Sequence, residues 1–146
     1  MIRTAKAHWT GDGPTGAGTV STPQSGVLKA QPLSFKLRFE NADGTAGTNP
    51  EELIAAAHSG CFSMALAFAL GQAGHPATSI DTEALVDLKP QATGGFAIET
   101  ITLKVAASVP GISAEQFATI AAGAKAGCPI SKALASVPIA LEATLV

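Results

Sequence analysis

The segment 53–70, which contains no charged residue, constrains the fold of this chain more than any other feature. Its only polar residues are His58, Ser59 and Ser63. A helix that is apolar on all sides either spans a membrane or is enclosed by protein, and this segment is just long enough to cross a bilayer. Because Glu51 and Glu52 precede it, Trp and Tyr belts are missing and strands are expected around it, we expect an enclosed helix.

The residues before this segment predict where the helix begins. Asn49 can cap it, Pro50 suits the first helical position, and Glu52 stands three residues after Asn49, as a capping box requires. The helix can continue to about Leu70, and Gly71 and Gly74 offer ways to end it.

Strands are predicted on both sides of this helix. In the first forty residues they are broken by turn signals at GDGPTGAG and TPQSG. The clearest strand is 33–39, where apolar and polar residues alternate and Arg38 lies on the polar face. Beyond the helix, strands at 79–88 and 96–105 are joined by the turn PQATGG.

The C-terminal part adds a helix and a strand. Ser113 and Gln116 form a second capping box, and apolar residues at helical spacing predict a helix that stops near Gly127. A strand at 139–146 closes the chain. No repeat, low-complexity tract or linker interrupts the sequence, so we expect a single α+β domain over residues 1–146.

The composition excludes several classes of protein. Hydrophobic residues make up 47% of the chain and charged residues only 14%, so disorder is not expected. Nine Lys and Arg against eleven Asp and Glu give a formal net charge of -2, whereas a nucleic-acid binder normally carries a basic excess. Because no secretory signal stands out, we expect a cytoplasmic protein without nucleic-acid or membrane partners.

Two cysteines, Cys61 and Cys128, are candidates for chemistry. They are too few for a disulfide scaffold, neither lies in a C-x-x-C motif, and the three histidines do not complete a zinc-finger spacing. No metal site is therefore expected. Cys61 can be a small core residue, and Cys128 can be a small residue that fills a helix-capping position. If the two meet, a peroxide can oxidise one thiolate to a sulfenic acid, which then condenses with the other thiol.

Local physics favours Cys128 as the more acidic thiol. It precedes Pro129 at the start of a short predicted helix, 130–135, where unpaired backbone N–H groups stabilise a thiolate. Cys61 lies well inside the long helix, where the dipole effect has faded and burial should raise its pKa. A thiolate at Cys61 therefore needs a cation from elsewhere. Of the two arginines, Arg3 and Arg38, the second is the better candidate.

Glu51 and His58 have competing interpretations. Glu51 is most simply a first-turn carboxylate favoured by the helix dipole, or else it holds the Arg38 guanidinium in a bidentate pair. Ten residues separate Glu51 from Cys61, about 15 Å of helical rise, so Glu51 can serve a cysteine only across a dimer or through a long intermediary. His58 shares a helix face with Cys61 and can act as its base, although a lone His on an apolar helix is more often a core residue.

Several segments together resemble a known family. They are SGVLKAQPLSFKLRFE, GTNPEELIAAAHSGCFSMALAFALGQAG, VPGIS and AKAGCPISKAL. They resemble the OsmC branch of the OsmC/Ohr family of peroxide-reducing proteins over essentially the full chain. The most specific part is the NPEEL-to-GCF block with a later CP-x-S-K. The resemblance implies an α+β fold in which curved antiparallel sheets wrap around long apolar central helices, in an intertwined homodimer.

The resemblance also implies a chemistry. It implies a peroxidase that reduces organic hydroperoxides, and hydrogen peroxide more weakly, without cofactor or metal. Position by position, Cys61 takes the place of the family's reactive cysteine and Cys128 that of its resolving cysteine. Arg38 matches the arginine of the RFE segment, and Glu51 matches the glutamate after NP. The implied cycle passes through a Cys61 sulfenic acid and a Cys61–Cys128 disulfide, which an external dithiol reopens; in the Ohr branch this is a lipoylated protein.

A function of a different class is the alternative. A dimeric binding domain can hold an apolar acyl or lipid-like ligand in a cleft while its cysteines are incidental. Consumption of peroxide in the presence of a dithiol separates an enzyme from such a binding domain.

Overall fold

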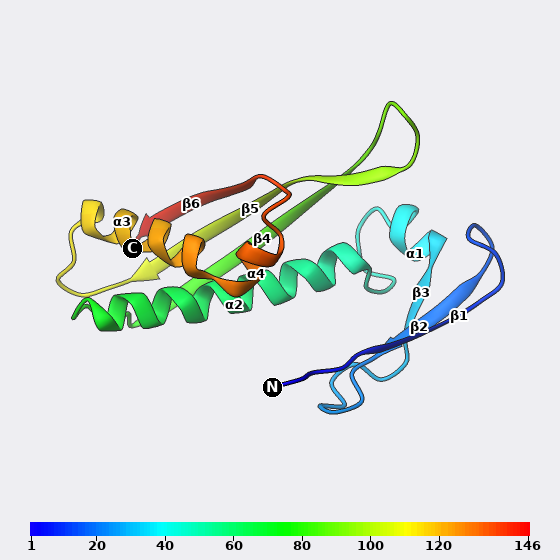
Figure 1. The fold of residues 1–146 in the computed structure, drawn as a ribbon, viewed down its shortest axis with the longest axis horizontal. Coiled ribbons are helices and arrows are strands. Elements are labelled where there is room, and N and C mark those ends of the chain that lie inside the picture. Colours follow the sequence, from blue (N-terminus) through cyan, green and yellow to red (C-terminus); the bar gives the residue numbers. More distant parts are fainter. The chain divides into compact units, whose positions relative to one another are not determined.

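The computed structural model describes residues 1–146, which divide into two compact units, 1–53 and 54–146. The first unit contains a three-stranded sheet and a short helix, and the second contains another three-stranded sheet with helices packed on it (Figure 1). The long helix begins at the end of the first unit and continues through the second. Each unit is described by itself below.

The first unit is built on an antiparallel sheet with the strand order β1-β2-β3. Its strands are β1 (Lys6–Thr10), β2 (Ala17–Ser21) and β3 (Gln31–Ser34). The predicted turns at GDGPTGAG and TPQSG connect them, which confirms the interpretation of the N-terminal region. At the first turn, a Cβ on Gly16 would lie only 2.2 Å from the carbonyl oxygen of Asp12, so the turn closes only with glycine there.

The strand predicted over 33–39 is wrong beyond Ser34. The residues that follow form a short helix, α1 (Phe35–Phe39), and the Ser34 hydroxyl caps it by accepting a hydrogen bond from the backbone N–H of Leu37 at 3.1 Å. Arg38 therefore projects from a helix and not from the polar face of a strand. Over five residues the alternation of apolar and polar side chains fits either element, and the capping serine decides between them.

The predicted long helix is α2 (Pro50–Gln72). The side-chain oxygen of Asn49 accepts a hydrogen bond from the backbone N–H of Glu52 at 2.8 Å, which confirms the cap. The carboxylate of Glu52 accepts instead from the Thr48 hydroxyl at 2.8 Å, so the reciprocal half of the predicted capping box is replaced. After the helix, Gly74 adopts a φ of +82°, the left-handed conformation that commonly ends helices.

The sheet of the second unit has the order β4-β5-β6. β4 (Ser79–Pro90) and β5 (Phe96–Ser108) form the predicted antiparallel hairpin and extend beyond the predicted ends. β6 (Ile139–Leu145) pairs with β5 in parallel, so the expectation of antiparallel sheets is wrong for this pair. Parallel neighbours need a crossover connection, which here consists of α3 (Ala114–Gly127) and α4 (Pro129–Ala133).

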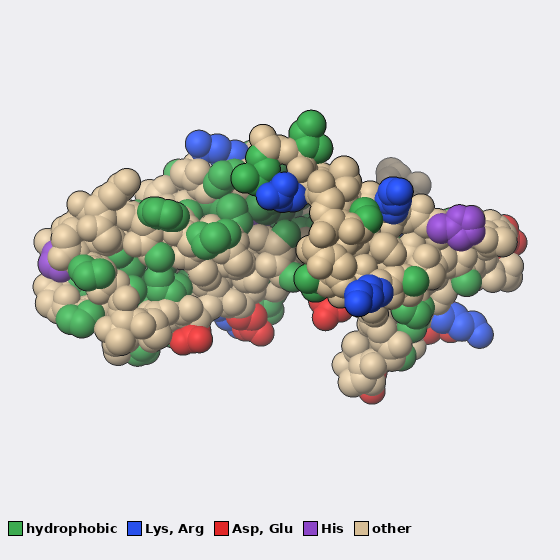
Figure 2. Space-filling view, turned by 90° about the horizontal axis from the view of Figure 1, so that it is seen from below, with side chains coloured by type: hydrophobic (Ala, Val, Ile, Leu, Met, Phe, Trp, Pro, Cys, Tyr) green, Lys and Arg blue, Asp and Glu red, His purple; other side chains and the backbone are tan.

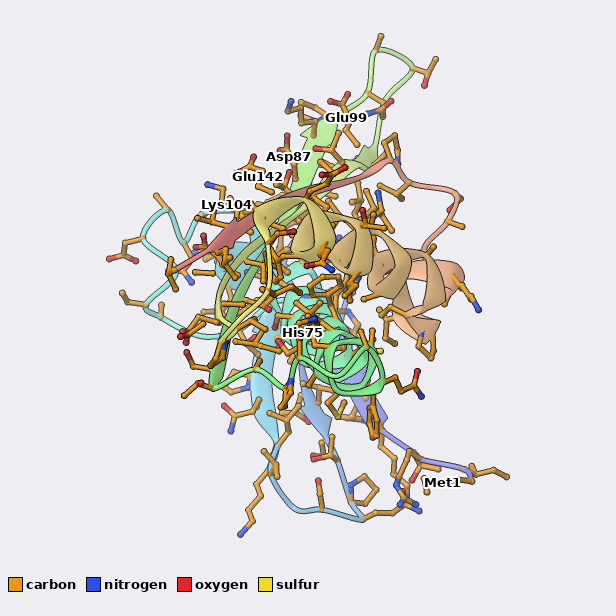
Figure 3. The ribbon with its side chains drawn as sticks, turned by 90° about the vertical axis from the view of Figure 1, so that its left-hand side faces the viewer. Met1, His75, Asp87, Glu99, Lys104 and Glu142 are labelled. Atoms are coloured by element: carbon orange, nitrogen blue, oxygen red, sulfur yellow. The ribbon has the colours of Figure 1, made fainter.

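The core of the second unit lies between one face of this sheet and the helices. Its members come from three elements: Leu103, Val105 and Ala107 of β5, Phe62, Leu66 and Leu70 of α2, and Phe117, Ala121 and Ala124 of α3. The intervening β5 residues face away from the core. Charged side chains of the sheet, including Lys104 and Glu142, lie on the side away from α2 and α3 (Figure 3).

Within a single chain, α2 is enclosed on one face only. Met64 and Phe68 are 62% and 73% exposed, and hydrophobic side chains gather along this side of the helix (Figure 2). By length and composition alone α2 is apolar enough to cross a membrane, but its other face belongs to the core of the second unit. The predicted enclosure of the whole helix is thus met by this chain only in part.

Candidate active site

Two cysteines from distant parts of the chain meet in the second unit. Cys61 lies in the middle of α2, and Cys128 lies between α3 and α4. Their Sγ atoms are 3.2 Å apart, although 67 residues separate them, and both thiols are free. An S–S bond measures about 2.05 Å, so a disulfide needs only a small approach of the two atoms.

The ends of two helices hold Cys128 at this point. The predicted capping box of Ser113 and Gln116 starts α3, and the backbone N–H of Cys128 donates to the carbonyl of Ala124 at 2.9 Å where α3 ends. Pro129 then begins α4 at a position where no backbone N–H is needed. The Cys128 side chain is fully buried, whereas Cys61 is partly exposed.

The surroundings shift the two thiols in opposite directions. Burial raises the pKa of Cys61, and the neighbouring Cys128 raises it further against a lowering by the backbone N–H of Ile130. For Cys128, burial also acts to raise the pKa, but interactions with the backbone N–H and hydroxyl of Ser131 and with Cys61 outweigh it, and the pKa is lowered. This agrees with the sequence argument that Cys128 is the better placed thiol locally.

Acidity and access therefore favour different sulfur atoms. The more acidic thiol, Cys128, is sealed from solvent, and the accessible thiol, Cys61, is the less acidic. At 3.2 Å the two sulfurs can share one proton, so the pair titrates as a unit. Loss of one proton leaves a thiolate that either sulfur can carry.

His58 lies in the core of the same unit. Its side chain is fully buried, and its Nε2 lies 2.8 Å from the hydroxyl oxygen of Ser131. Burial lowers the pKa of His58, which keeps the ring neutral at neutral pH. The hydrogen bond thus goes to Ser131 and not to Cys61, which favours the core interpretation of this histidine. No group of three or more His, Cys, Asp or Glu side chains is arranged to hold a metal.

Ser131 was missed by the sequence reasoning. It is buried in α4 and interacts with both His58 and Cys128. A signal was present, because Ser131 stands three residues after Cys128 and a helix that starts at Pro129 turns such a residue back toward its cap.

In the first unit, Arg38 and Glu51 form the bidentate pair that the sequence offered as one interpretation of Glu51. Arg38 Nε donates to one carboxylate oxygen at 3.1 Å, and Nη2 donates to the other at 2.5 Å. The guanidinium carbon also lies 5.0 Å from the centroid of the Phe39 ring. A guanidinium held by a two-point hydrogen bond and an aromatic ring has a defined orientation.

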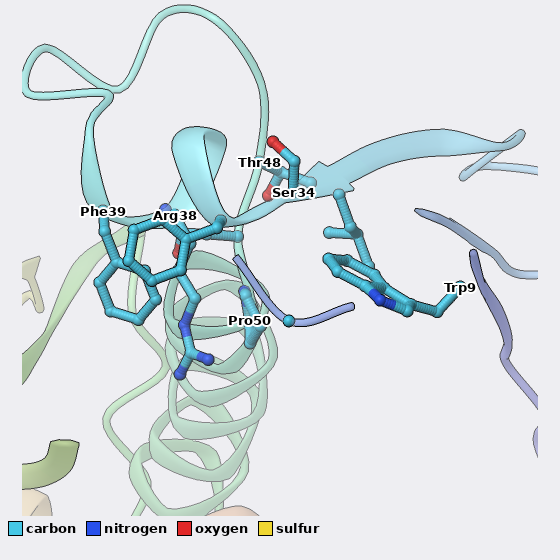
Figure 4. Close-up of a pocket in the computed structure, with 10 residues that line it drawn as sticks. Trp9, Ser34, Arg38, Phe39, Thr48 and Pro50 are labelled. Atoms are coloured by element: carbon cyan, nitrogen blue, oxygen red, sulfur yellow. The ribbon is translucent and has the colours of Figure 1, made fainter. Parts of the chain in front are cut away.

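A pocket of about 200 Å³ opens beside Arg38 in the same unit (Figure 4). Its apolar lining comes from Trp9, Leu33, Phe35, Phe39 and Pro50. The indole N–H of Trp9 donates to the carbonyl of Asp12 at 3.2 Å. Trp9 thus forms part of the pocket wall. A small organic group with a polar end fits the chemistry of such a pocket.

Comparisons with known proteins agree with these observations. Residues 42–142 match the family model described as OsmC-like protein. Peroxiredoxin OsmC of Escherichia coli (strain K12) is 57% identical over 129 residues, which cover 88% of this chain and 87% of that protein. The chain belongs to the OsmC family. The resemblance inferred from its motifs is thereby confirmed.

Solved structures share the fold of this OsmC family member. The organic hydroperoxide resistance protein OhrB of Bacillus subtilis is 26% identical, with a TM-score of 0.68 over 98% of both chains. An OsmC-like protein of Mycoplasma pneumoniae has a TM-score of 0.75 over 100% of this chain and 98% of that one. At 15% identity, the second likeness concerns the fold alone. A mixed α+β fold with two three-stranded sheets and a long central helix is confirmed.

Proposed function

We propose that the chain is a cysteine-based peroxidase that reduces organic hydroperoxides, and hydrogen peroxide more weakly. The observation that carries this proposal is the 3.2 Å separation of Cys61 Sγ and Cys128 Sγ. The E. coli relative is a peroxiredoxin by name, and the B. subtilis relative is an organic hydroperoxide resistance protein. A thiol pair in bonding range is the minimum that two-cysteine peroxide reduction needs.

The proposed cycle begins at the accessible sulfur. The Cys61 thiolate attacks the distal oxygen of the hydroperoxide, the O–O bond breaks, and the alkoxide leaves as an alcohol after taking up a proton. Cys61 is now a sulfenic acid. The Cys128 thiolate attacks the Cys61 sulfur, the S–O bond breaks, and hydroxide takes up a proton and leaves as water. An external dithiol then reduces the disulfide by thiol exchange, and a lipoylated protein is one such dithiol.

Arg38 is proposed as the cation that stabilises the Cys61 thiolate, with Glu51 as the residue that orients it. The bidentate contact between their side chains supports the second role. The first role would meet a need, because burial raises the pKa of Cys61 and none of the groups that act on this thiol is a cation. Glu51 and Cys61 lie ten residues apart along one continuous helix, so we propose that Arg38 and Glu51 act on the cysteine of a partner subunit.

A homodimer also gives the exposed side of α2 a partner. Met64 and Phe68 belong to an apolar helix face that water would otherwise cover. An intertwined pair of subunits with these faces together would enclose α2 as the sequence led us to expect, and would join both units of each chain into one OsmC-like domain.

The pocket beside Arg38 supports an organic substrate. Its lining is mostly apolar, so it favours the hydrocarbon part of an organic hydroperoxide over hydrogen peroxide. The same pocket is what favours the alternative, a domain that binds an apolar acyl or lipid-like ligand with incidental cysteines. Free thiols in bonding range suit the reducing cytosol, which we propose as the compartment.

Turnover of cumene hydroperoxide with a dithiol tests the proposal. The native protein should consume the peroxide, Cys61→Ser should abolish consumption, and Cys128→Ser should stop after one oxidation. Ser59→Ala, which removes a hydroxyl bonded only to the Ala56 carbonyl on the same helix, serves as the matched control. If Cys61→Ser retains native turnover, the peroxidase mechanism is wrong and the binding domain becomes the better account.

A further inference from the structure

His58 is the buried polar group to which the proposed cycle gives no role. It is fully buried, its Nε2 lies 2.8 Å from the Ser131 hydroxyl, and its Nδ1 has no hydrogen-bond partner. Because burial keeps the ring neutral, only one of its two nitrogen atoms carries a proton, and the surroundings of the two atoms differ.

The unpartnered Nδ1 indicates where this proton sits. A proton on Nδ1 would be a buried N–H without an acceptor, which is rarer in proteins than an acceptor left unpaired. With the proton on Nε2, that N–H donates to Ser131 Oγ, and only a lone pair on Nδ1 stays unsatisfied. The tautomer protonated on Nε2 therefore has the lower free energy.

This proton position orients the Ser131 hydroxyl. Once Oγ accepts from His58, the hydroxyl proton is free to point to another acceptor. Ser131 is the third residue of α4 and follows its cap, Cys128, by three residues, so the two side chains lie together at the first turn of this helix, and the Ser131 hydroxyl helps to lower the pKa of Cys128. The other groups that act on this sulfur are the N–H groups of Ile130 and Ser131 and the thiol of Cys61, none of them a charged side chain.

We propose that His58 holds the Ser131 hydroxyl as a hydrogen-bond donor to Cys128 Sγ, and that these two hydrogen bonds prepare the Cys128 thiolate to attack the Cys61 sulfenic acid. The inference rests on the proposed peroxidase function and deepens it. His58 and Ser131 are positioning residues here, since neither touches the peroxide. The reaction they assist is the second oxidative step, in which the S–S bond forms, the S–O bond breaks and water leaves.

Single-turnover kinetics test the proposed hydrogen bonds from His58 through Ser131 to Cys128. One equivalent of cumene hydroperoxide is added to the reduced protein, and the sulfenic acid and the disulfide are followed by mass after acid quenching. Ser131→Ala should slow disulfide formation about tenfold or more, the effect of losing one hydrogen bond to an ionised group, and should move its rate–pH profile to higher pH. The rate of sulfenic acid formation at Cys61 should change much less.

Two further variants separate this role from a general effect on packing. Ser131→Thr keeps the hydroxyl and should restore disulfide formation, whereas Ser63→Ala, which removes a half-buried hydroxyl bonded to Thr82, should leave it at the native rate. A native rate and pH profile in Ser131→Ala overturn the inference while the peroxidase proposal stands. Absence of sulfenic acid in the native protein would instead overturn the peroxidase proposal, and this inference with it.

The native protein also allows a test without any variant at position 131. A long-range proton–nitrogen NMR spectrum of the reduced protein reports which ring nitrogen of His58 is protonated, with His58→Gln used for assignment. We expect a neutral ring protonated on Nε2 at neutral pH. A ring protonated on Nδ1, or on both nitrogens, overturns the proposed direction of the hydrogen bonds.

Discussion

Replacing Phe68 by alanine should weaken the homodimer that we propose. Phe68 has 73% of its surface exposed in the single chain and lies on the apolar face of α2 that the core leaves uncovered. Full burial of a phenylalanine side chain contributes about 1.5–3 kcal/mol, so its exposed part still has roughly 1–2 kcal/mol to gain in an interface. A two-fold interface contains the residue twice, which gives roughly 2–4 kcal/mol per dimer.

This free energy corresponds to an increase of roughly 30- to 700-fold in the dimer dissociation constant. Sedimentation equilibrium over a dilution series measures that constant directly. Leu85→Ala is the matched control, because Leu85 is also an exposed apolar residue of the second unit but lies on the strand face away from the core. An unchanged dissociation constant for Phe68→Ala would refute the assignment of this helix face to the interface, and so would a native protein that is monomeric throughout.

Three further predictions concern charge, packing and pH. Arg38→Ala should raise the pH at which Cys61 becomes reactive toward iodoacetamide, while Arg3→Ala should not; an identical pH profile would exclude Arg38 as the stabilising cation. Phe62→Ala should lower the free energy of unfolding by about 3–5 kcal/mol in urea titrations, because this fully buried ring would leave a cavity, and a loss below about 1 kcal/mol would contradict its core position. Burial lowers the pKa of His58 below its ordinary value of 6.5, so as the pH falls through 6.5 the unfolded state takes up the proton first and stability should decline. Stability that declines equally in His58→Gln over the same window would assign the effect to other groups.

The sequence predicted those elements whose signals are local. The capping box of Ser113 and Gln116 marks the start of α3, and Asn49 with Pro50 marks the start of α2, because each cap involves only neighbouring residues. The same rule explains the error at 33–39. There the alternation of apolar and polar residues favours a strand, but Ser34 is also a local signal, because a serine before the first helical residue caps a helix.

The direction of β6 depends on a longer-range feature. Two strands separated by a helix often pair in parallel, and the spacing of β5, α3 and β6 contained that signal. The expectation of antiparallel sheets came from family resemblance, and the crossover through α3 overrides it for one pair of strands.

The candidate site shows where reasoning from the residues ends. Local physics predicted that Cys128 would be the more acidic thiol, and the lowered pKa of Cys128 agrees. It could not predict that Cys61 lies 3.2 Å away, because no local signal links residues that are 67 positions apart. The approach of the two sulfurs follows from packing of α2 and α3 on the same sheet face, and only the family resemblance anticipated it.

The Arg38–Glu51 pair lies between these cases. Its two residue types and their chemistry could be identified from the sequence, and the bidentate contact agrees with one of the two interpretations offered for Glu51. The helix that presents Arg38 was not predicted. Ser131 was overlooked because its buried contact with His58 appears only when α2 and α4 are packed together.

The mass of the intact protein after one equivalent of organic hydroperoxide is the most direct test of the central claim, that Cys61 and Cys128 act together. We predict the loss of two hydrogen atoms from each chain, with a single peptide cross-link between positions 61 and 128 after proteolysis without reductant. A stable gain of one oxygen atom without this cross-link, or no change in mass at all, would contradict it.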